Sequence, residues 1–287
     1  MTMKVNEEFL DRANGLRIFM RSWHPPGPPR AVVAICHGVK SHSGYYQWIA
    51  EQLVANGFAV YALDLRGRGR SDGERFFVED VSQYVDDVSA LIELTQRREG
   101  DLPLFLLGHS AGGVVSSTYT LDNQERLAGF ICESFAYRVY APDFLLTIIK
   151  AISRIVPRLP ALRLKNRDFS RDPAVVAFMD GDPLIAGEVQ PMATVAALAR
   201  ANDNLKTGFA SIRCPVLILH GTEDKVTRPS GSLEFHETAG APDKTLKRYD
   251  GHSHDLFNDI GRERVLTDIV AWINARLPAA KELSAAG

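Results

Sequence analysis

Short runs of apolar residues alternate along this chain with segments whose apolar residues recur every three or four positions. Runs of this length are typical of strands that are buried on both faces of a sheet, and they fall at residues 31–36, 58–63, 104–107, 127–132 and 215–219. The segments between them have helical periodicity, as in residues 81–95. The alternation predicts an α/β fold in which helices cover both faces of a mostly parallel central sheet.

The alternation lapses between residues 133 and 211, where helix-like stretches are interrupted by six prolines. We expect this segment, 133–211, to be an inserted helical cap, so that residues 1–132 and 212–287 together form the core. At the start of the chain, residues 3–22 read as two short strands around Asn14-Gly15, a pair typical of a tight hairpin turn.

One of the apolar runs leads directly into a glycine-bounded serine. Residues 108–112 read Gly-His-Ser-Ala-Gly, and a small and β-branched stretch follows that can continue as a helix. A strand, G-x-S-x-G and a helix form a sharp turn that exposes the serine hydroxyl, here that of Ser110. Gly108 and Gly112 suit this turn because the backbone passes too close for a Cβ. Ser110 is therefore a candidate nucleophile.

A serine hydroxyl is a poor nucleophile unless an imidazole takes its proton and a carboxylate orients that imidazole. Asp224 follows the strand at 215–219, and His254 follows another at 244–249. Catalytic groups in open α/β sheets gather at the carboxyl ends of the strands, and this fold requires the order Ser, acid, His. Ser110, Asp224 and His254 meet both conditions, and we predict that they form a catalytic triad.

The same mechanism needs two backbone N–H groups to stabilise the negative oxygen of the intermediate. One is expected from Ala111, the residue after the nucleophile. The other is expected from the loop after the strand at 31–36, at Val39.

Composition narrows the class of protein further. Of the 287 residues 45% are hydrophobic and 24% charged, and the formal net charge is −2, so we expect a globular protein with no nucleic-acid partner. We find no targeting or membrane-spanning segment, and expect a cytoplasmic monomer or weak homo-oligomer. Three widely spaced cysteines are expected to be buried free thiols: Cys36, Cys132 and Cys214.

Two other features could suggest a cofactor. Gly67, Gly69 and Gly73 do not form G-x-G-x-x-G, so we interpret them as a tight turn between a strand and a helix. His252 and His254 have the spacing of a metal-ligand pair, but no further histidine or carboxylate pattern completes such a site. We therefore expect neither a metal nor an organic cofactor.

Several sequence blocks match those of one enzyme group. Residues 37–46, HGVKSHSGYY, resemble H-G-x-G-E-H-S-G-R-Y, and residues 64–73, DLRGRGRSDG, resemble D-x-x-G-x-G-x-S-x-G. Matching blocks also occur at residues 182–184, 220–224 and 249–256. The chain thus resembles the monoacylglycerol lipase / lysophospholipase-like group of α/β-hydrolases, of the serine aminopeptidase S33 type. The resemblance extends over residues 16–272 and implies an α/β-hydrolase fold.

Two places depart from the group's blocks. Lys40 and Ser41 replace the Gly-Glu that follows the oxyanion residue, which puts a bulky cation beside the predicted site. Glu133, at a strand end, stands with Ser134 where the group usually has Ser-Pro. Glu133 could be an alternative triad acid, a substrate contact or a structural hydrogen-bonding residue. We favour the structural role and keep Asp224 as the acid.

The expected substrate contacts lie mainly in the cap. Phe144, Ile148 and Ile152 share one helical face, and His109 beside the nucleophile is a further candidate. Residues 138–171 contain eight basic and two acidic residues, a net charge of +6. A basic helix with an apolar face can lie transiently on an anionic lipid surface, or the apolar face can pack on the core and line an acyl pocket. We favour packing, and both can hold if the cap opens.

These features predict a serine carboxylester hydrolase that cleaves aliphatic acyl esters through an acyl-enzyme, with His254 rather than His252 as its base by the same resemblance. The apolar cap favours a medium acyl chain on a small polar alcohol, such as a monoacylglycerol or lysophospholipid, with oligomeric aliphatic esters as an extension. The alternatives are a thioesterase, C–C hydrolase or haloperoxidase-like reaction of the same triad, and a catalytically silent lipid- or partner-binding module.

Overall fold

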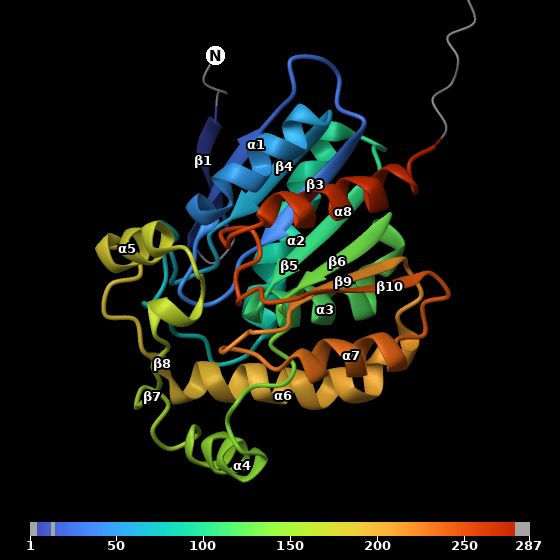
Figure 1. Ribbon diagram of the computed structural model, residues 1–287. Helices are drawn as coiled ribbons and strands as arrows, with labels where there is room; N and C mark the ends of the chain where they lie inside the picture. Colours follow the sequence, from blue (N-terminus) through green and yellow to red (C-terminus); the bar gives the residue numbers. More distant parts are fainter. Residues whose placement is uncertain (1–4, 13–14, 279–287) are drawn as a thin grey trace, which may run out of the picture.

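The computed structural model of the protein describes residues 5–12 and 15–278 and is built around an eight-stranded central sheet (Figure 1). β2 pairs antiparallel with β1 and β4, and the other neighbouring strands run parallel. The predicted mostly parallel sheet is thereby confirmed. In spatial order its strands are β1 (Val5–Asp11), β2 (Arg17–Trp23), β4 (Phe58–Leu63), β3 (Ala31–Cys36), β5 (Leu104–His109), β6 (Gly129–Glu133), β9 (Val216–Gly221) and β10 (Lys244–Tyr249).

The first two strands form the predicted hairpin. They pair along their whole length, from Val5 opposite Trp23 to Asp11 opposite Arg17. Gly15 in the connection has φ +81°, a left-handed conformation that glycine adopts without a Cβ clash. Asn14, the other residue of the predicted turn, lies outside the described residues.

Alternate side chains of the parallel strands enter two apolar layers, one on each face of the sheet. In β3, Val32 and Ala34 belong to one layer, and Val33 and Ile35 to the other. Both faces are therefore buried, which explains why the strands are continuous apolar runs. The first layer includes helices α2 (Ser82–Glu99), α3 (Ala111–Asn123) and α7 (Pro229–Thr238), and the second includes α1 (Gln47–Ala55) and α8 (Arg262–Asn274). No helix of the described chain is long and apolar enough to cross a bilayer.

The segment from residue 133 to residue 211 adds three α-helices, as the helix-like pattern predicts. It also contains a two-stranded sheet, which that pattern does not predict. α6 lies against α3 and contributes Ala197, Ala201 and Leu205 to the core layer, while α4 packs on α6 (Figure 1). Because α6 shares the core layer, the division into core and cap stays a prediction. The elements are α4 (Asp143–Ile152), β7 (Pro160–Leu162), α5 (Pro173–Gly181), β8 (Gln190–Pro191) and α6 (Met192–Gly208).

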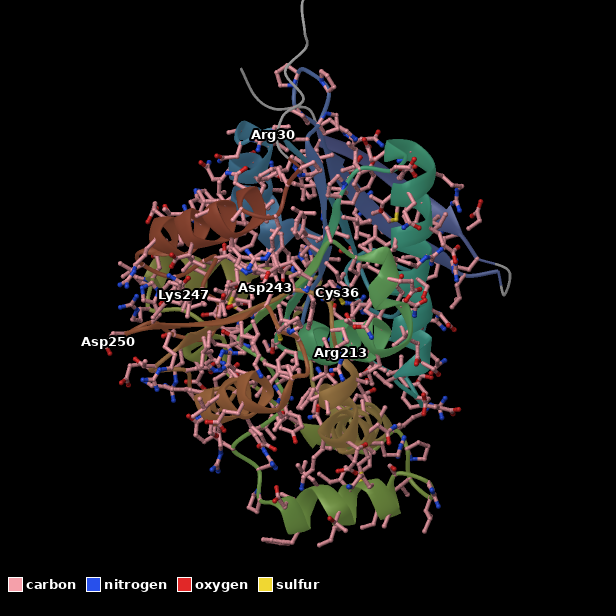
Figure 2. All side chains as sticks on the ribbon, turned by 90° about the vertical axis from the view of Figure 1, so that its right-hand side faces the viewer. Arg30, Cys36, Arg213, Asp243, Lys247 and Asp250 are labelled. Carbon is pink, nitrogen blue, oxygen red and sulfur yellow. The ribbon has the colours of Figure 1, made fainter. Side chains whose placement is uncertain are left out.

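All three cysteines of the sequence are buried free thiols, as their spacing predicts. Cys36 lies at the end of β3 in the interior, whereas Asp250, after β10, lies at the outer edge of the molecule (Figure 2). Burial raises the pKa of the Cys36 thiol to about 12 and that of Cys214 to about 11, and raises the pKa of Cys132 well above its ordinary value. All three thiols are protonated at neutral pH.

An aromatic cluster fixes α7 to the core. The Phe235 ring on this helix is fully buried, with its centroid 4.6 Å from that of Phe209 and 5.3 Å from that of Phe135. Phe209 lies in the 3₁₀ helix η4 (Phe209–Ser211), and Phe135 follows β6. Since α7 follows the loop that carries Asp224, this packing fixes the helix next to the predicted acid.

Replacing Phe235 with alanine should lower the free energy of unfolding by about 3–5 kcal/mol, because it leaves a cavity where a fully buried ring stood. The matched control is Leu233→Ala on the same helix, whose side chain is 40% exposed, and whose loss should cost less than about 1 kcal/mol. Urea unfolding followed by circular dichroism measures both. Equal losses would contradict the assignment of this face of α7 to the core.

Candidate active site

The turn after β5 presents Ser110. This residue has φ 56° and ψ −119°, a backbone conformation that is strained for any residue with a side chain. A Cβ added to Gly108 would lie 2.7 Å from the carbonyl oxygen of Gly112, and a Cβ added to Gly112 would overlap the carbonyl oxygen of Cys36. The expected strand–turn–helix is present, but the crowding at Gly112 comes from the neighbouring strand β3.

Ser110, His254 and Asp224 lie together at the carboxyl ends of β5, β10 and β9. Oγ of Ser110 is 2.9 Å from Nε2 of His254, and Nδ1 of His254 is 2.7 Å from Oδ2 of Asp224. All three residues are buried, and the Phe169 ring packs on the imidazole in a T-shaped arrangement with a centroid distance of 5.1 Å. The hydroxyl, imidazole and carboxylate are thus linked in the order that proton removal from a serine requires.

The carboxylate of Asp224 has further donors of its own. Oδ1 accepts the backbone N–H of Val226 at 2.7 Å and of Thr227 at 2.9 Å. Oδ2 accepts the Thr227 hydroxyl at 2.8 Å and lies 3.1 Å from Nε2 of His220. Burial alone would raise the pKa of Asp224, but the adjacent His254 and the hydrogen bonds from His220 and His254 outweigh burial and hold this pKa well below its ordinary value. The carboxylate is therefore ionised at neutral pH.

Two backbone N–H groups beside Ser110 have no acceptor among the described residues. Ala111 is the first residue of α3, so its N–H has no acceptor within the helix. In the described part of the chain no acceptor meets the N–H of Val39. A Cβ added to Gly38 would lie 2.8 Å from Cβ of Ser110 and 3.4 Å from the nitrogen of Ala111, so the loop that carries Val39 touches the serine turn.

Glu133 is fully buried and bonded within the structure. Its Oε1 accepts the Ser134 hydroxyl at 2.8 Å and the Leu256 N–H at 3.1 Å. Burial raises the pKa of Glu133 well above its ordinary value. Nδ1 of His254 is bonded to Asp224, and Glu133 makes no hydrogen bond to this imidazole in the described chain. The geometry favours the structural role of Glu133 over that of a triad acid.

His109, the predicted substrate contact beside the nucleophile, is buried in the structure. It is 1% exposed, and its Nδ1 lies 2.7 Å from the hydroxyl of Tyr46. Its Nε2 is 3.3 Å from Oε2 of Glu133, although the two atoms do not have hydrogen-bond geometry. Burial lowers the pKa of His109 well below its ordinary value, so the ring is neutral. His109 packs beside the imidazole of His254, with the ring centroids 5.1 Å apart, and its contact with a substrate stays a prediction.

The apolar face of α4 does not pack on the core as we expected. Ile149 is the buried residue of this helix, whereas Phe144, Ile148 and Ile152 are 69%, 45% and 37% exposed. Among the described elements, α6 is the one that makes extensive contact with α4. Only the side of α4 around Ile149 is therefore covered. The three predicted acyl contacts are therefore surface residues in this structure.

The remaining candidates of the sequence analysis lie as follows. Lys40 is nearly buried, and its backbone N–H donates to Oε1 of Glu188 at 2.9 Å. His252 lies 3.7 Å from a carboxylate oxygen of Asp259, and the other histidine of the pair, His254, contacts Ser110 and Asp224. Within residues 5–12 and 15–278, no group of three or more His, Cys, Asp and Glu side chains could hold a metal ion.

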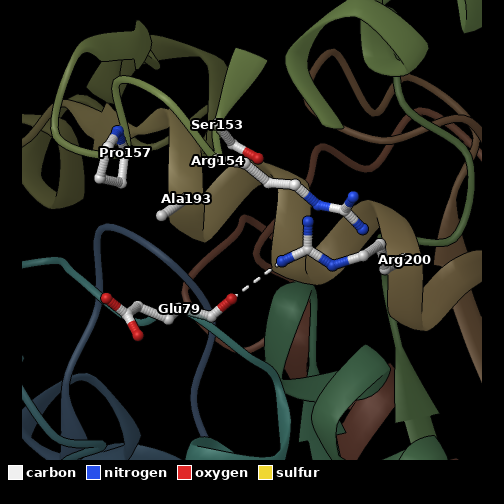
Figure 3. A pocket seen from close by; sticks show the side chains of 6 residues that line it. All are labelled: Glu79, Ser153, Arg154, Pro157, Ala193 and Arg200. Carbon is white, nitrogen blue, oxygen red and sulfur yellow. Dashed lines mark hydrogen bonds between the residues drawn. The ribbon is translucent and has the colours of Figure 1, made fainter. Parts of the chain in front are cut away.

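A cavity of about 420 Å³ lies apart from these residues, between α4, α6 and the chain before α2 (Figure 3). Arg154 and Arg200 extend toward each other across it, and Arg200 donates to the backbone oxygen of Glu79 at 2.9 Å. Neither Ser110 nor His254 nor Asp224 lines it. The cavity is therefore separate from the candidate active site.

Comparison with known proteins places this geometry in a family. Residues 27–261 match the family described as "Serine aminopeptidase, S33". The chain belongs to this family. It is 31% identical over 265 residues to a monoacylglycerol lipase of Mycolicibacterium smegmatis, covering 92% of this chain and 95% of the relative. It is 30% identical over 276 residues to a monoglyceride lipase of Homo sapiens, covering 94% and 91%. The predicted family and enzyme class, a serine hydrolase acting on carboxylic esters, are confirmed.

Solved structures confirm the predicted α/β-hydrolase fold. The monoacylglycerol lipase of Paleococcus ferrophilus is 28% identical and superimposes with a TM-score of 0.82, covering 90% of this chain and 99% of that one. A soluble variant of monoglyceride lipase from Saccharomyces cerevisiae, in complex with a substrate analog, gives a TM-score of 0.86 over 97% and 96% of the two chains. Its identity is 20%, so it supports the fold alone.

The sequence analysis missed three residues that hold the site in place. His220 and Thr227 contact Asp224 from four residues before it and three after it. Their spacing in one loop was a usable signal, because polar side chains often bond to nearby groups of the same turn. Glu188 gave no signal, since it lies 148 residues from Lys40.

The two candidate acids can be separated by isosteric amides. Asp224→Asn should lower kcat by about 10⁴-fold, because an amide cannot hold the imidazole in the required tautomer. Glu133→Gln should change kcat by less than about tenfold, because Glu133 does not contact His254 and its raised pKa already favours the neutral form. Initial rates on a p-nitrophenyl ester measure both. A larger loss in Glu133→Gln would make Glu133 the acid.

Proposed function

We propose that Ser110, His254 and Asp224 form a catalytic triad that hydrolyses aliphatic acyl esters through an acyl-enzyme. The observation that carries this is the contact series from Oγ of Ser110 to Nε2 of His254 at 2.9 Å and from Nδ1 to Asp224 at 2.7 Å. The unpartnered N–H groups of Val39 and Ala111 beside Ser110 support it, because a tetrahedral oxyanion requires such donors.

The chemistry runs in two balanced halves. As Oγ of Ser110 bonds to the ester carbonyl carbon, Nε2 of His254 takes the hydroxyl proton, and the oxyanion accepts hydrogen bonds from Val39 and Ala111. His254 then gives its proton to the departing alcohol, which leaves an acyl-Ser110. Water attacks this ester with His254 again as base, the proton returns to Oγ, and the acid is released. Asp224, ionised at neutral pH, stabilises the imidazolium in both halves.

The proposed substrates are monoacylglycerols or lysophospholipids, esters of an aliphatic acid with a small polar alcohol. The relatives named monoacylglycerol or monoglyceride lipase are covered over more than nine-tenths of their length, which favours this class. The test compares hydrolysis rates on monoacylglycerols, p-nitrophenyl esters, acyl-CoAs and oligomeric aliphatic esters of matched chain length. It distinguishes monoacylglycerol hydrolysis from thioester cleavage and from hydrolysis of oligomeric esters.

Ser110→Ala should lower kcat by on the order of 10⁶-fold, because the nucleophile is removed while the imidazole and acid stay in place. The matched control is Ser253→Ala, which changes the residue next to His254 and should keep kcat within about threefold, since no triad contact is lost. Hydrolysis of a p-nitrophenyl ester and labelling by a fluorophosphonate probe provide two readouts. Labelled or active Ser110→Ala protein would refute the assignment.

A second proposal concerns the cap surface. Phe144 is 69% and Ile155 81% exposed, with Ile148, Val156 and Leu159 exposed beside them. Of the eight basic residues at 138–171, four are in ion pairs with Glu234, Asp203, Glu74 and Asp259. The unpaired four among the described residues are Arg154, Arg163, Lys165 and Arg167. An apolar surface flanked by free cations favours transient contact with an anionic lipid surface.

The double substitution of Phe144 and Ile155 by serine should weaken binding to vesicles of phosphatidylglycerol by at least about tenfold, because each apolar side chain contributes about 1.5–3 kcal/mol when it is fully buried. Activity on a monomeric p-nitrophenyl ester should not change. Vesicle flotation measures the binding, with Leu233→Ser on α7 as the control for an exposed apolar side chain elsewhere. Wild-type binding by the double variant would exclude this surface.

A further inference from the structure

The oxyanion loop contains a residue in an unfavourable backbone conformation. We use this name for residues 37–43, the chain between β3 and the 3₁₀ helix η1 (Ser43–Tyr46). Lys40 in this loop has φ 52°, in the left-handed region that residues with a Cβ occupy at a cost. Something outside the residue must therefore stabilise this conformation.

A carboxylate from the cap segment meets the backbone of this residue. Oε1 of Glu188 accepts the Lys40 N–H at 2.9 Å. The same oxygen accepts Nη1 of Arg68 at 2.7 Å, and Nη2 of Arg68 donates to Oε1 of Gln190 at 2.6 Å. The side chains of Arg68 and Glu188 are 2% and 1% exposed. Nε2 of Gln190 also donates to Oε1 of Glu188, at 2.5 Å. A buried acceptor with three donors is held far more rigidly than a surface side chain.

The Lys40 contact lies between two other anchors of the oxyanion loop. At one end the N–H of Leu65 donates to Nε2 of His37 at 2.9 Å, and at the other the N–H of Ser43 donates to Oδ1 of Asp64 at 2.6 Å. Both of these partners belong to the turn after β4. The free N–H of Val39 lies between the anchors, one residue before the N–H that Glu188 binds.

We propose that Glu188 is a positioning residue for the oxyanion hole, because its bond to the Lys40 N–H fixes the peptide plane that follows Val39. This inference rests on the proposed function, in which the Val39 N–H binds the oxyanion. Gly38 fixes the Val39 backbone from one side by its contact with the serine turn, and Glu188 fixes it from the other. The cap segment thus sets the direction of a catalytic donor without touching the substrate.

The first test separates the acceptor from the ion pair. Glu188→Met removes the acceptor and should lower kcat by about 10–100-fold with KM within about threefold, because displacement of a reacting group by about 1 Å costs rate rather than binding. Affinity for an alkyl boronic acid, which forms a tetrahedral adduct with the serine, should fall by a similar factor. Glu188→Gln keeps an acceptor oxygen and should retain most of kcat.

The matched control is the ion pair between Arg66, in the same turn, and Asp87, in α2. Nη2 of Arg66 lies 2.7 Å from Oδ1 of the fully buried Asp87, and in the described chain neither side chain makes a hydrogen bond or ion pair to the oxyanion loop. Asp87→Asn should lower stability without a matching loss of kcat. A folded Glu188→Met enzyme with wild-type kcat, or an equal kcat loss in Asp87→Asn, would overturn the proposal.

A second series leaves the ion pair intact and decides the matter if Glu188→Met does not fold. At position 40, kcat should follow the ease with which each residue adopts a positive φ: highest for glycine, lower for alanine and lowest for valine. Lys40→Gly should also restore at least tenfold of the kcat lost in Glu188→Met, because glycine needs no clamp to stay left-handed. If kcat did not follow this order, or if a folded double variant showed no rescue, the positioning role of Glu188 would be refuted.

These outcomes are distinct from a failure of the proposed function. If the wild-type enzyme does not hydrolyse esters or Ser110→Ala stays active, the triad assignment itself fails. If Ser110→Ala is inactive and the variants at positions 188 and 40 match the wild type in kcat and boronic acid affinity, only the role of Glu188 is wrong.

Discussion

The close approach between the end of β3 and the turn after β5 is the constraint on which the candidate site depends. Gly38 and Gly112 are the points of contact, and neither has room for a Cβ. The contact brings the loop that follows β3 against Ser110 and puts two backbone N–H groups beside one hydroxyl. In this arrangement Ser110 has a strained backbone conformation. The buried strands on either side of β5 stabilise this conformation.

Much of this arrangement could be predicted because it is local in the sequence. Buried strands give continuous apolar runs, and two of them, β3 and β4, begin and end at the residues that the pattern indicated, as does the less buried edge strand β10. The positions of Ser110, Asp224 and His254 follow from strand order, since parallel strands bring their carboxyl ends to one edge of the sheet. The turn at Gly112 was predicted as well, although the neighbouring strand that crowds it was not.

The failures concern contacts between distant segments. The apolar spacing of α4 gave the right helix, but periodicity cannot tell whether an apolar face is covered by the core or exposed, and Phe144 turned out to be exposed. His109 was chosen for its place next to Ser110, yet alternation along β5 directs it inward to Tyr46. The ion pair of Arg68 and Glu188 joins residues that are 120 positions apart in the sequence, and no local pattern predicts it.

The three buried cysteines have a practical consequence for the chemistry of labelling. A thiol reacts as its thiolate, and burial raises the pKa of all three thiols well above neutrality. Electrophiles that attack both serine and cysteine side chains in other proteins will therefore meet no competing thiolate here. Covalent modification of the native enzyme by such compounds reports on its hydroxyl nucleophile, and mild oxidants should leave the three cysteines of the folded protein unmodified without added reductant.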